Sequence, residues 1–190
     1  QNRSCLPANL MPSLGASSAS SGPVKFEVCL PNKKSSDSFG WRLDAIDGRT
    51  LYVCEVVNDS RWAIWQYNWS VPDSQAVRPG DYIVAVGDAC NDSLAMASAL
   101  TDKEQPSFVI QRPALFEFRI TKDVARSCLQ LKYAPGGTSL LVKEVNGSAR
   151  LHLQQGDRIL RVNRIKGQAE SLLAAMREDD VLNLQVSRAL

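Results

Sequence analysis

The sequence predicts a mainly β protein in which one small α+β unit occurs twice. The stretch Gly80–Val86 recurs as Gly156–Val162 after 76 residues, and the same offset places Arg112 on Arg188. Each copy also runs in the same order, from a Gly-Asp turn into a strand, then an apolar stretch of helical period and a closing strand. A match at a fixed period is stronger evidence of architecture than local propensity.

The repeat divides the 190 residues into a tail and two units. We expect an N-terminal tail at 1–23, a first unit at 24–113 and a second unit at 114–190. The tail is rich in Ser, Ala, Pro and Gly, so it cannot bury enough apolar surface to offset its ordering entropy. Its composition resembles the end of an organelle-targeting region, and we expect a structure outside the units to hold it. The short join Arg112-Pro113-Ala114 predicts a rigid pair.

Alternation of apolar and polar residues predicts the remaining strands. In the first unit these are Val24–Leu30, Phe39–Leu43 and Leu51–Val56, with a hairpin signal at Asp47-Gly48. In the second unit they are Phe116–Ile120 and Leu140–Val145, the latter preceded by a turn at Pro135-Gly136-Gly137.

The order of these elements resembles that of a PDZ domain, present twice over about residues 24–190. The similarity lies in the loop Phe39-Gly40-Trp41, the hairpin, the Gly-Asp-x-Ile stretch, the helix and the final strand ending in Arg. It implies a mainly β (α+β) fold of two tandem, partly open β-barrels, each with five or six strands and one or two helices. Divergent tandem units of this kind are also found in algal proteins.

The resemblance implies a peptide site in the first unit. PDZ domains add an extended peptide as a strand beside their second strand and hold its carboxylate in a loop of backbone N–H groups. The residues that match this site are Lys34, Phe39, Gly40, Trp41 and Leu43 from the loop and strand, and Ser93, Ala97 and Leu100 from the helix. Ser38 replaces the first loop glycine, and Trp41 is large enough to fill the pocket. The alternative is therefore that the same residues form a closed core.

The second unit departs further from the family pattern. Its loop, Arg126–Leu131, lacks the glycine that lets a backbone approach a carboxylate. Ala169, Leu173 and Met176 are still placed to line a groove. We expect a structural or docking module here rather than capture of C-terminal peptides.

The first unit carries a 13-residue insertion at about 57–70 that holds three of the four tryptophans. Trp62, Trp65 and Trp69 stand at helical spacing, so a short helix places them on one face, beside Tyr67. They are expected either to anchor a partner protein or to cover the core and the seam between the units.

The two units differ in charge, with net charges of −3 for 24–113 and +4 for 114–190. This asymmetry favours a basic docking face that includes Arg158, Arg161 and Arg164, the alternative being ordinary solvated positions. No aromatic and basic residues interleave as in a nucleic-acid groove. No apolar run is long enough for a membrane helix, so membrane contact is expected only through partners.

The sequence argues against an enzyme. His152 is the only histidine, no phosphate-binding loop occurs, and the five cysteines are scattered without paired spacing. We therefore expect no metal, no cofactor and mostly reduced thiols.

These observations favour a noncatalytic protein that binds other proteins. In one form it is a peripheral accessory subunit of a larger hetero-oligomeric assembly, such as a plastid photosystem complex, which places it in an organelle after loss of a targeting segment. The alternative is a soluble adaptor that captures partner C-termini. A regulatory fragment of a protease is the remote alternative.

Overall fold

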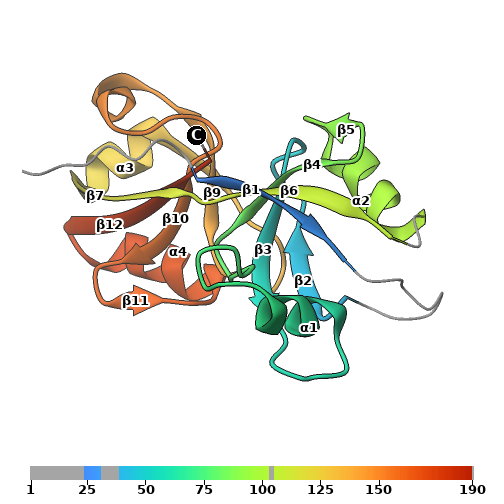
Figure 1. The fold of residues 1–190 in the computed structure, drawn as a ribbon. Coiled ribbons are helices and arrows are strands. Elements are labelled where there is room, and N and C mark those ends of the chain that lie inside the picture. Colours follow the sequence, from blue (N-terminus) through green and yellow to red (C-terminus); the bar gives the residue numbers. More distant parts are fainter. Residues whose placement is uncertain (1–23, 31–38, 103–104, 190) are drawn as a thin grey trace, which may run out of the picture.

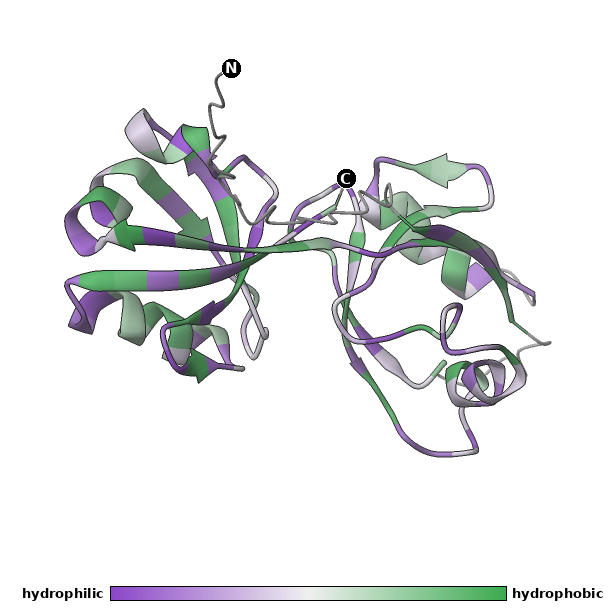
Figure 2. Ribbon diagram, turned by 60° about the vertical axis from the view of Figure 1, so that its left-hand side comes forward, coloured by the Kyte–Doolittle hydropathy of each residue, from purple (hydrophilic) through white to green (hydrophobic). Residues whose placement is uncertain are grey.

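The structure is a computed structural model that describes residues 24–30, 39–102 and 105–189. The described residues form two antiparallel sheets of six strands each, which lie side by side (Figures 1 and 2). We call the part with the sheet from Lys25 to Gln111 the first unit, and the part with the sheet from Ala114 to Arg188 the second unit. The tail predicted at 1–23 lies outside the described residues.

The first sheet has the strand order β1-β6-β4-β3-β2, with β5 paired to β4. Its strands are β1 (Lys25–Cys29), β2 (Trp41–Asp44), β3 (Leu51–Val56), β4 (Tyr82–Val86), β5 (Ala89–Cys90) and β6 (Ser107–Gln111). Helix α1 (Ala63–Ser70) lies in the insertion, and α2 (Ser93–Asp102) precedes β6. The Asp92 carboxylate starts α2, because it accepts hydrogen bonds from the N–H groups of Leu94 and Ala95 at 3.0 Å.

The second sheet repeats this arrangement in the order β7-β12-β10-β9-β8, with β11 paired to β10. Its strands are β7 (Ala114–Thr121), β8 (Leu129–Lys132), β9 (Leu140–Val145), β10 (Arg158–Val162), β11 (Ile165–Lys166) and β12 (Val181–Arg188). Its helices are α3 (Lys122–Cys128), the 3₁₀ turn η1 (Gly147–Leu151) and α4 (Ala169–Glu178). Because the buried residues of α4 recur every three to four positions, one face of this helix packs on the sheet.

The two sheets share their irregularities as well as their order. A register shift falls at Val84 between β4 and β6, and at Leu160, 76 residues later, between β10 and β12. A bulge of this kind bends the strand and turns a side chain out of the regular ladder. The prediction of two tandem, partly open β-barrels with five or six strands and one or two α-helices each is confirmed.

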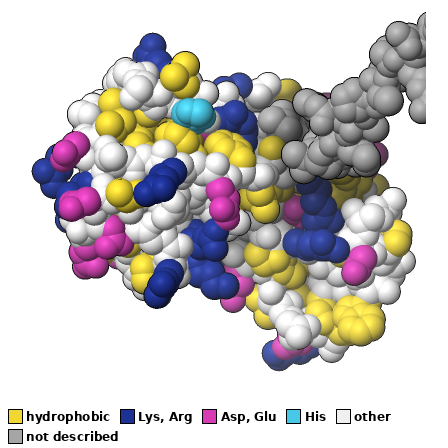
Figure 3. Space-filling view, turned by 90° about the vertical axis from the view of Figure 1, so that its left-hand side faces the viewer, with side chains coloured by type: hydrophobic (Ala, Val, Ile, Leu, Met, Phe, Trp, Pro, Cys, Tyr) yellow, Lys and Arg dark blue, Asp and Glu magenta, His cyan; other side chains and the backbone are white. Residues whose placement is uncertain are grey.

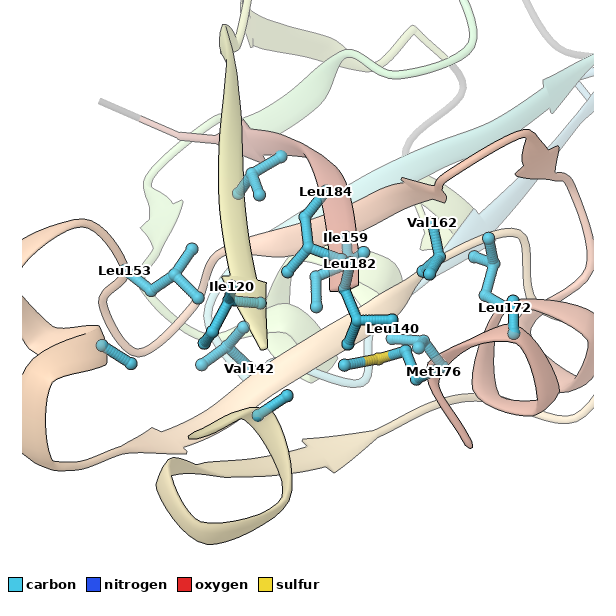
Figure 4. Packing of buried hydrophobic residues seen from close by; sticks show 14 of the residues in the cluster. Ile120, Leu140, Val142, Leu153, Ile159, Val162, Leu172, Met176, Leu182 and Leu184 are labelled. Carbon is cyan, nitrogen blue, oxygen red and sulfur yellow. The ribbon is translucent and has the colours of Figure 1, made fainter. Parts of the chain in front are cut away.

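Each unit has its own hydrophobic core. The first is built around buried residues that include Val28, Leu51, Ile83, Met96 and Phe108. In the second, Leu140, Ile159 and Leu182 from the strands lie close to Leu172 and Met176 from α4 (Figure 4). Strand residues of period two and helix residues of period 3.6 thus meet in each core, as the sequence pattern predicts.

The repeated Gly-Asp turn is tied to the arginine that closes each sheet. Arg112 Nη1 lies 3.0 Å from both carboxylate oxygens of Asp81. In the second unit, Nε and Nη2 of Arg188 each lie 2.7 Å from a carboxylate oxygen of Asp157. Both aspartates are buried, so the ion pairs offset the cost of burying the carboxylates. This contact explains why the repeat contains Asp and Arg at this spacing.

The join between the units is short. β6 ends at Gln111 and β7 begins at Ala114, so the chain passes directly from one sheet into the other (Figure 2). The units also bury side chains against each other: Arg158 Nη1 lies 2.7 Å from Asp44 Oδ2, and the Tyr82 hydroxyl lies 3.0 Å from that of Ser187. A charged pair and a hydroxyl pair therefore cross between the two units.

The structure bears on membrane crossing and on the state of the cysteines, in both cases for the described residues alone. No helix in 24–30, 39–102 or 105–189 is long and apolar enough to cross a membrane. Within the same ranges the cysteines Cys29, Cys54, Cys90 and Cys128 are free thiols.

Candidate functional site

A groove lies between β8 and α4 of the second unit. It has a volume of about 470 Å³ and an apolar lining. The apolar residues are Leu129 and Leu131 from β8, Leu173 and Met176 from α4, and Ala125 from α3. Along the same groove lie the basic residues Lys122, Arg126 and Arg177. The site therefore combines an apolar lining with cationic side chains.

Strand β8 is an edge strand, and this makes the groove suitable for an added strand. It pairs with β9 on one side, and no described strand pairs with its other side. An edge presents backbone N–H and C=O groups that a further strand can use. Leu129 and Leu131 are half-buried whereas Gln130 and Lys132 are exposed, as expected for a strand with one face on the groove.

A helix replaces the carboxylate loop before β8. Thr121 begins α3 by accepting a hydrogen bond from the N–H of Val124, and the helix runs directly into the strand. The N–H of Leu129 donates to the carbonyl of Ala125 and is used inside the chain. A cradle of successive backbone N–H groups is thus not formed at Leu129, and any anion at this end must be held by side chains.

The cations of the groove differ in how they are paired. Lys122 Nζ lies 2.7 Å from Asp180 Oδ1, and this lysine lowers the pKa of the Asp180 carboxyl through its hydrogen bond and charge. Arg126 and Arg177 form no ion pair with any described residue. Two arginines are therefore available to an acidic group on a bound segment.

The corresponding residues of the first unit are packed together as a core. The Trp41 ring lies 5.8 Å from the Phe39 ring and 5.2 Å from the Phe108 ring, between centroids. Leu43, Ala97 and Leu100 belong to or pack on the same apolar cluster. Five of the residues predicted to bind a peptide are thus brought together, with the Trp41 indole packed against Phe39 and Phe108.

Two further predicted residues are polar. Ser93 is buried, and its hydroxyl donates to the carbonyl of Ala45 at 3.2 Å. This contact ties the start of α2 to the end of β2. Lys34 lies outside the described residues.

Gly40 is covered by the insertion. Its φ of +83° lies in the left-handed region, and a Cβ placed there would lie 2.3 Å from Cβ of Trp62. The carbonyl of Gly40 accepts a hydrogen bond from the N–H of Val57 at 2.8 Å, and the carbonyl of Phe39 accepts one from Ile64 at 3.1 Å. The start of the insertion therefore packs on the loop that was predicted to hold a carboxylate.

The structure separates the three tryptophans of the insertion. Trp62 precedes α1 and lies on Gly40, whereas Trp65 and Trp69 lie within α1 with ring centroids 5.3 Å apart. Trp69 is 74% exposed, and the Trp65 indole N–H donates to Asn58 Oδ1 at 2.9 Å. Tyr67 packs on the core of the first unit. The insertion thus both covers the first unit and exposes the Trp69 side chain beside a half-buried Trp65.

The three arginines expected on a basic docking face lie in different environments. Arg158 is fully buried between the units and is not part of an exposed face. Burial alone would lower its pKa, but the charge and hydrogen bond of Asp44 outweigh burial and raise the pKa. Arg161 forms an ion pair with Glu117, and Arg164 is exposed. Figure 3 shows Lys and Arg interspersed with Asp and Glu on one face of the molecule.

His152 lies on the surface beside an aromatic ring. Its imidazole stacks on Phe118 with ring centroids 4.7 Å apart, and in Figure 3 the histidine is flanked by hydrophobic side chains. Its backbone carbonyl accepts a hydrogen bond from Arg188 at 3.0 Å. Within the described part of the chain, no three His, Cys, Asp or Glu side chains gather as a metal site would require.

The comparisons with known proteins bear on the fold. No family model and no curated protein matches the chain. Among solved structures, it is similar to the complex of INAD PDZ45 with NORPA CC-PBM, at 11% identity and a TM-score of 0.37, over 88% of this chain and 92% of that chain. It is also similar to INAD PDZ45 in complex with an NG2 peptide, at 13% identity and a TM-score of 0.35, over 98% and 96% of the two chains.

The strand order decides the fold, because TM-scores this low carry no weight by themselves. Both units have the order of elements along the chain that the PDZ resemblance implies, with a helix between the Gly-Asp strand and the closing strand, and their two sheets share one strand order. The fold is that of two tandem PDZ-like units.

The sequence analysis did not identify Lys122, Leu129, Leu131 or Arg177 as groove residues. The alternation in Leu129-Gln130-Leu131-Lys132 was the available signal. Because Arg126–Leu131 lacks the loop glycine, the family pattern predicts the peptide site in the first unit instead.

Proposed function

We propose that the protein is a noncatalytic protein-binding module whose β8–α4 groove takes an extended polypeptide segment. The observation that carries this proposal is the apolar groove beside the open edge of β8. Backbone hydrogen bonds to β8 supply affinity, and the pocket formed by Leu129, Leu131, Leu173 and Met176 takes apolar side chains. Arg126 and Arg177 favour an acidic side chain or a terminal carboxylate on the same segment.

A peptide library tests this proposal directly. The full chain is used to select short peptides with free and with amidated C-termini, and the affinities of selected peptides are then measured. We expect peptides with alternating apolar residues and an acidic group. Leu173→Asp places a charge in the apolar groove and should abolish binding, and Arg126→Gln together with Arg177→Gln should weaken it about tenfold.

Two variants on α2 of the first unit serve as controls. Leu94→Asp changes a side chain that is 76% exposed and should leave binding unchanged. Ala97 occupies the repeat position of Leu173, so Ala97→Asp reports on a site in the first unit. Loss of binding in Ala97→Asp but not in Leu173→Asp would move the site to the Phe39-Gly40-Trp41 loop and support the adaptor alternative. Selection of no peptide at all would contradict both sites.

A second candidate function is that of a peripheral subunit of a larger protein assembly. The observation that favours it is the Trp69 side chain, which is 74% exposed and packs beside Trp65, because Trp anchors are enriched in the centres of protein interfaces. A plastid membrane complex is one form of this proposal. Native mass determination of the gently extracted protein tests it, since a resident subunit migrates with its partners and an adaptor migrates alone.

A further inference from the structure

A second, larger cavity lies between the two units. It has a volume of about 780 Å³ and is lined by residues from both sheets. Tyr82, Val84 and Gln111 contribute from the first unit, and Leu141 and Gly156 from the second. A volume of this size falls in the range of about 300–1,000 Å³ that is usual for small-molecule sites. The β8–α4 groove lies elsewhere and shares no lining residue with it.

The charged lining of this cavity is strongly basic. Lys25 and Arg49 reach it from the first unit, and Lys132 and Lys143 reach it from the second. Asp47 is the single acidic residue among the lining residues. The cavity therefore gathers cations from both units, although the first unit is acidic as a whole.

Asp47 is occupied within its own turn. One carboxylate oxygen accepts the N–H groups of Arg49 and Thr50 at 2.8 Å, and the other accepts the Thr50 hydroxyl at 2.5 Å. These hydrogen bonds satisfy the carboxylate locally. Asp47 consequently compensates little of the positive charge of the four cations.

The four cations also lack carboxylate partners among the described residues, unlike many other Lys and Arg side chains there. Eight Lys or Arg side chains form an ion pair with Asp or Glu within the described residues, and none of the eight lines this cavity. All four residues are exposed, so their charges are free to pair with an anion that enters the cavity. The hydrogen-bonding side chains Thr50, Asn91, Gln154 and Gln155 complete the polar lining.

We propose that the cavity between the units binds a small polyanion that carries at least two phosphate groups. Lysine and arginine side chains placed around one cavity suit several separate anionic groups better than a single carboxylate. Because both units supply cations, the ligand contacts both and stabilises their association. A soluble polyphosphate and the headgroup of a phosphoinositide share this chemistry.

Calorimetric titration of the full chain tests the site. The probes are tripolyphosphate and inositol hexakisphosphate, with orthophosphate for comparison. We expect both polyanions to bind and orthophosphate to bind much more weakly. Lys132→Gln with Lys143→Gln should weaken polyanion binding by about tenfold or more, since it removes two charge-assisted contacts. Arg49→Gln should weaken it from the other unit.

A matched variant separates a built site from general charge. Arg164→Gln with Lys166→Gln removes the same charge from exposed positions of the second unit outside the cavity, and should change the affinity less than about twofold. Vesicles of phosphatidylcholine with phosphatidylinositol bisphosphate provide a second arm. Binding to these vesicles that is lost in the cavity variant supports a headgroup, whereas binding of the free probes alone supports a soluble ligand. Equal weakening in the two double variants, or no binding of any probe or vesicle, would overturn the proposal.

Discussion

Tyr82 and Arg158 occupy the same position of the two repeats, two residues after the repeated glycine, and both are fully buried where the units meet. Tyr82 contacts the hydroxyl of Ser187 in the second unit, and Arg158 contacts Asp44 and the Tyr52 ring in the first. The neighbouring bulge residues Val84 and Leu160 pack against the buried cluster that contains Tyr52 and Tyr82. The units therefore associate through equivalent faces whose side chains differ in chemistry.

Asp44→Asn should lower the free energy of unfolding by about 3 kcal/mol or more, because it leaves the buried Arg158 charge without a counter-charge. The amide oxygen can still accept the N–H of Ile46, which Asp44 now holds at 2.7 Å. Denaturant unfolding measures the loss. Glu55→Ala, at the exposed Arg42–Glu55 pair, should cost less than about 1 kcal/mol. The double variant Asp44→Asn with Arg158→Met should recover most of the stability that Asp44→Asn loses. If Asp44→Asn alone lowers the free energy of unfolding by less than Glu55→Ala does, the buried ion pair does not have this role.

The contact between the units should weaken at alkaline pH. Burial raises the pKa of Tyr82 from 10.0 to about 12, so the folded chain holds its phenolic proton more tightly than the unfolded chain. The contribution of Tyr82 to the free energy of unfolding is fully present below about pH 10. It falls as the pH rises toward about 12, by up to about 1.4 kcal/mol per pH unit. Denaturant unfolding over this range measures the slope.

Tyr82→Phe should reduce that slope while costing about 1 kcal/mol at neutral pH, since the Ser187 hydroxyl loses its partner. Tyr133→Phe, at a side chain that is 37% exposed, is the control and should leave the slope unchanged. An identical alkaline slope in Tyr82→Phe and the unmodified protein would refute the role of this tyrosine.

Gly40→Ala should destabilise the first unit more than Gly48→Ala. Both glycines have positive φ, which costs a residue with a Cβ about 1–2 kcal/mol. At Gly48 nothing lies within 4 Å of the added Cβ, whereas at Gly40 the Cβ meets Trp62 at 2.3 Å. Comparing the two unfolding free energies isolates the contact with Trp62. Trp62→Gly removes the Cβ that lies 2.3 Å from the added Cβ and should therefore make the Gly40→Ala change less costly. Additive effects of the two changes would show that the residues are not coupled.

Trp69→Ala should change the free energy of unfolding by less than about 0.5 kcal/mol, because the side chain is 74% exposed. Trp62→Ala should cost about 2 kcal/mol or more, since it removes the side chain packed on Gly40. Thermal melting of both variants checks this difference. With stability unchanged, any loss of co-migrating partners in Trp69→Ala reports on an interface alone. A large drop in melting temperature for Trp69→Ala would place this side chain in the core.

The repeat made much of the fold predictable. The offset of 76 residues that relates Gly80-Asp81 to Gly156-Asp157 also relates the two bulges and the two Asp–Arg ion pairs. The candidate groove was less predictable, because α3 replaces the loop before β8 through a helix start at Thr121. The family pattern predicts a carboxylate site at Gly40 of the first unit. In the structure, Trp62 from the insertion lies against this glycine.

The sequence by itself determined the number of units and the order of most of their elements along the chain, because these depend on local periodicity and on a repeat that can be read along the chain. Only the tertiary structure decided which side chains meet at the predicted grooves and where Arg158 lies. Both depend on contacts between residues far apart in the chain: Trp62 with Gly40, Arg158 with Asp44, and Leu129 with Leu173 across the groove. Such contacts arise from the packing of whole elements, and no local pattern encodes them.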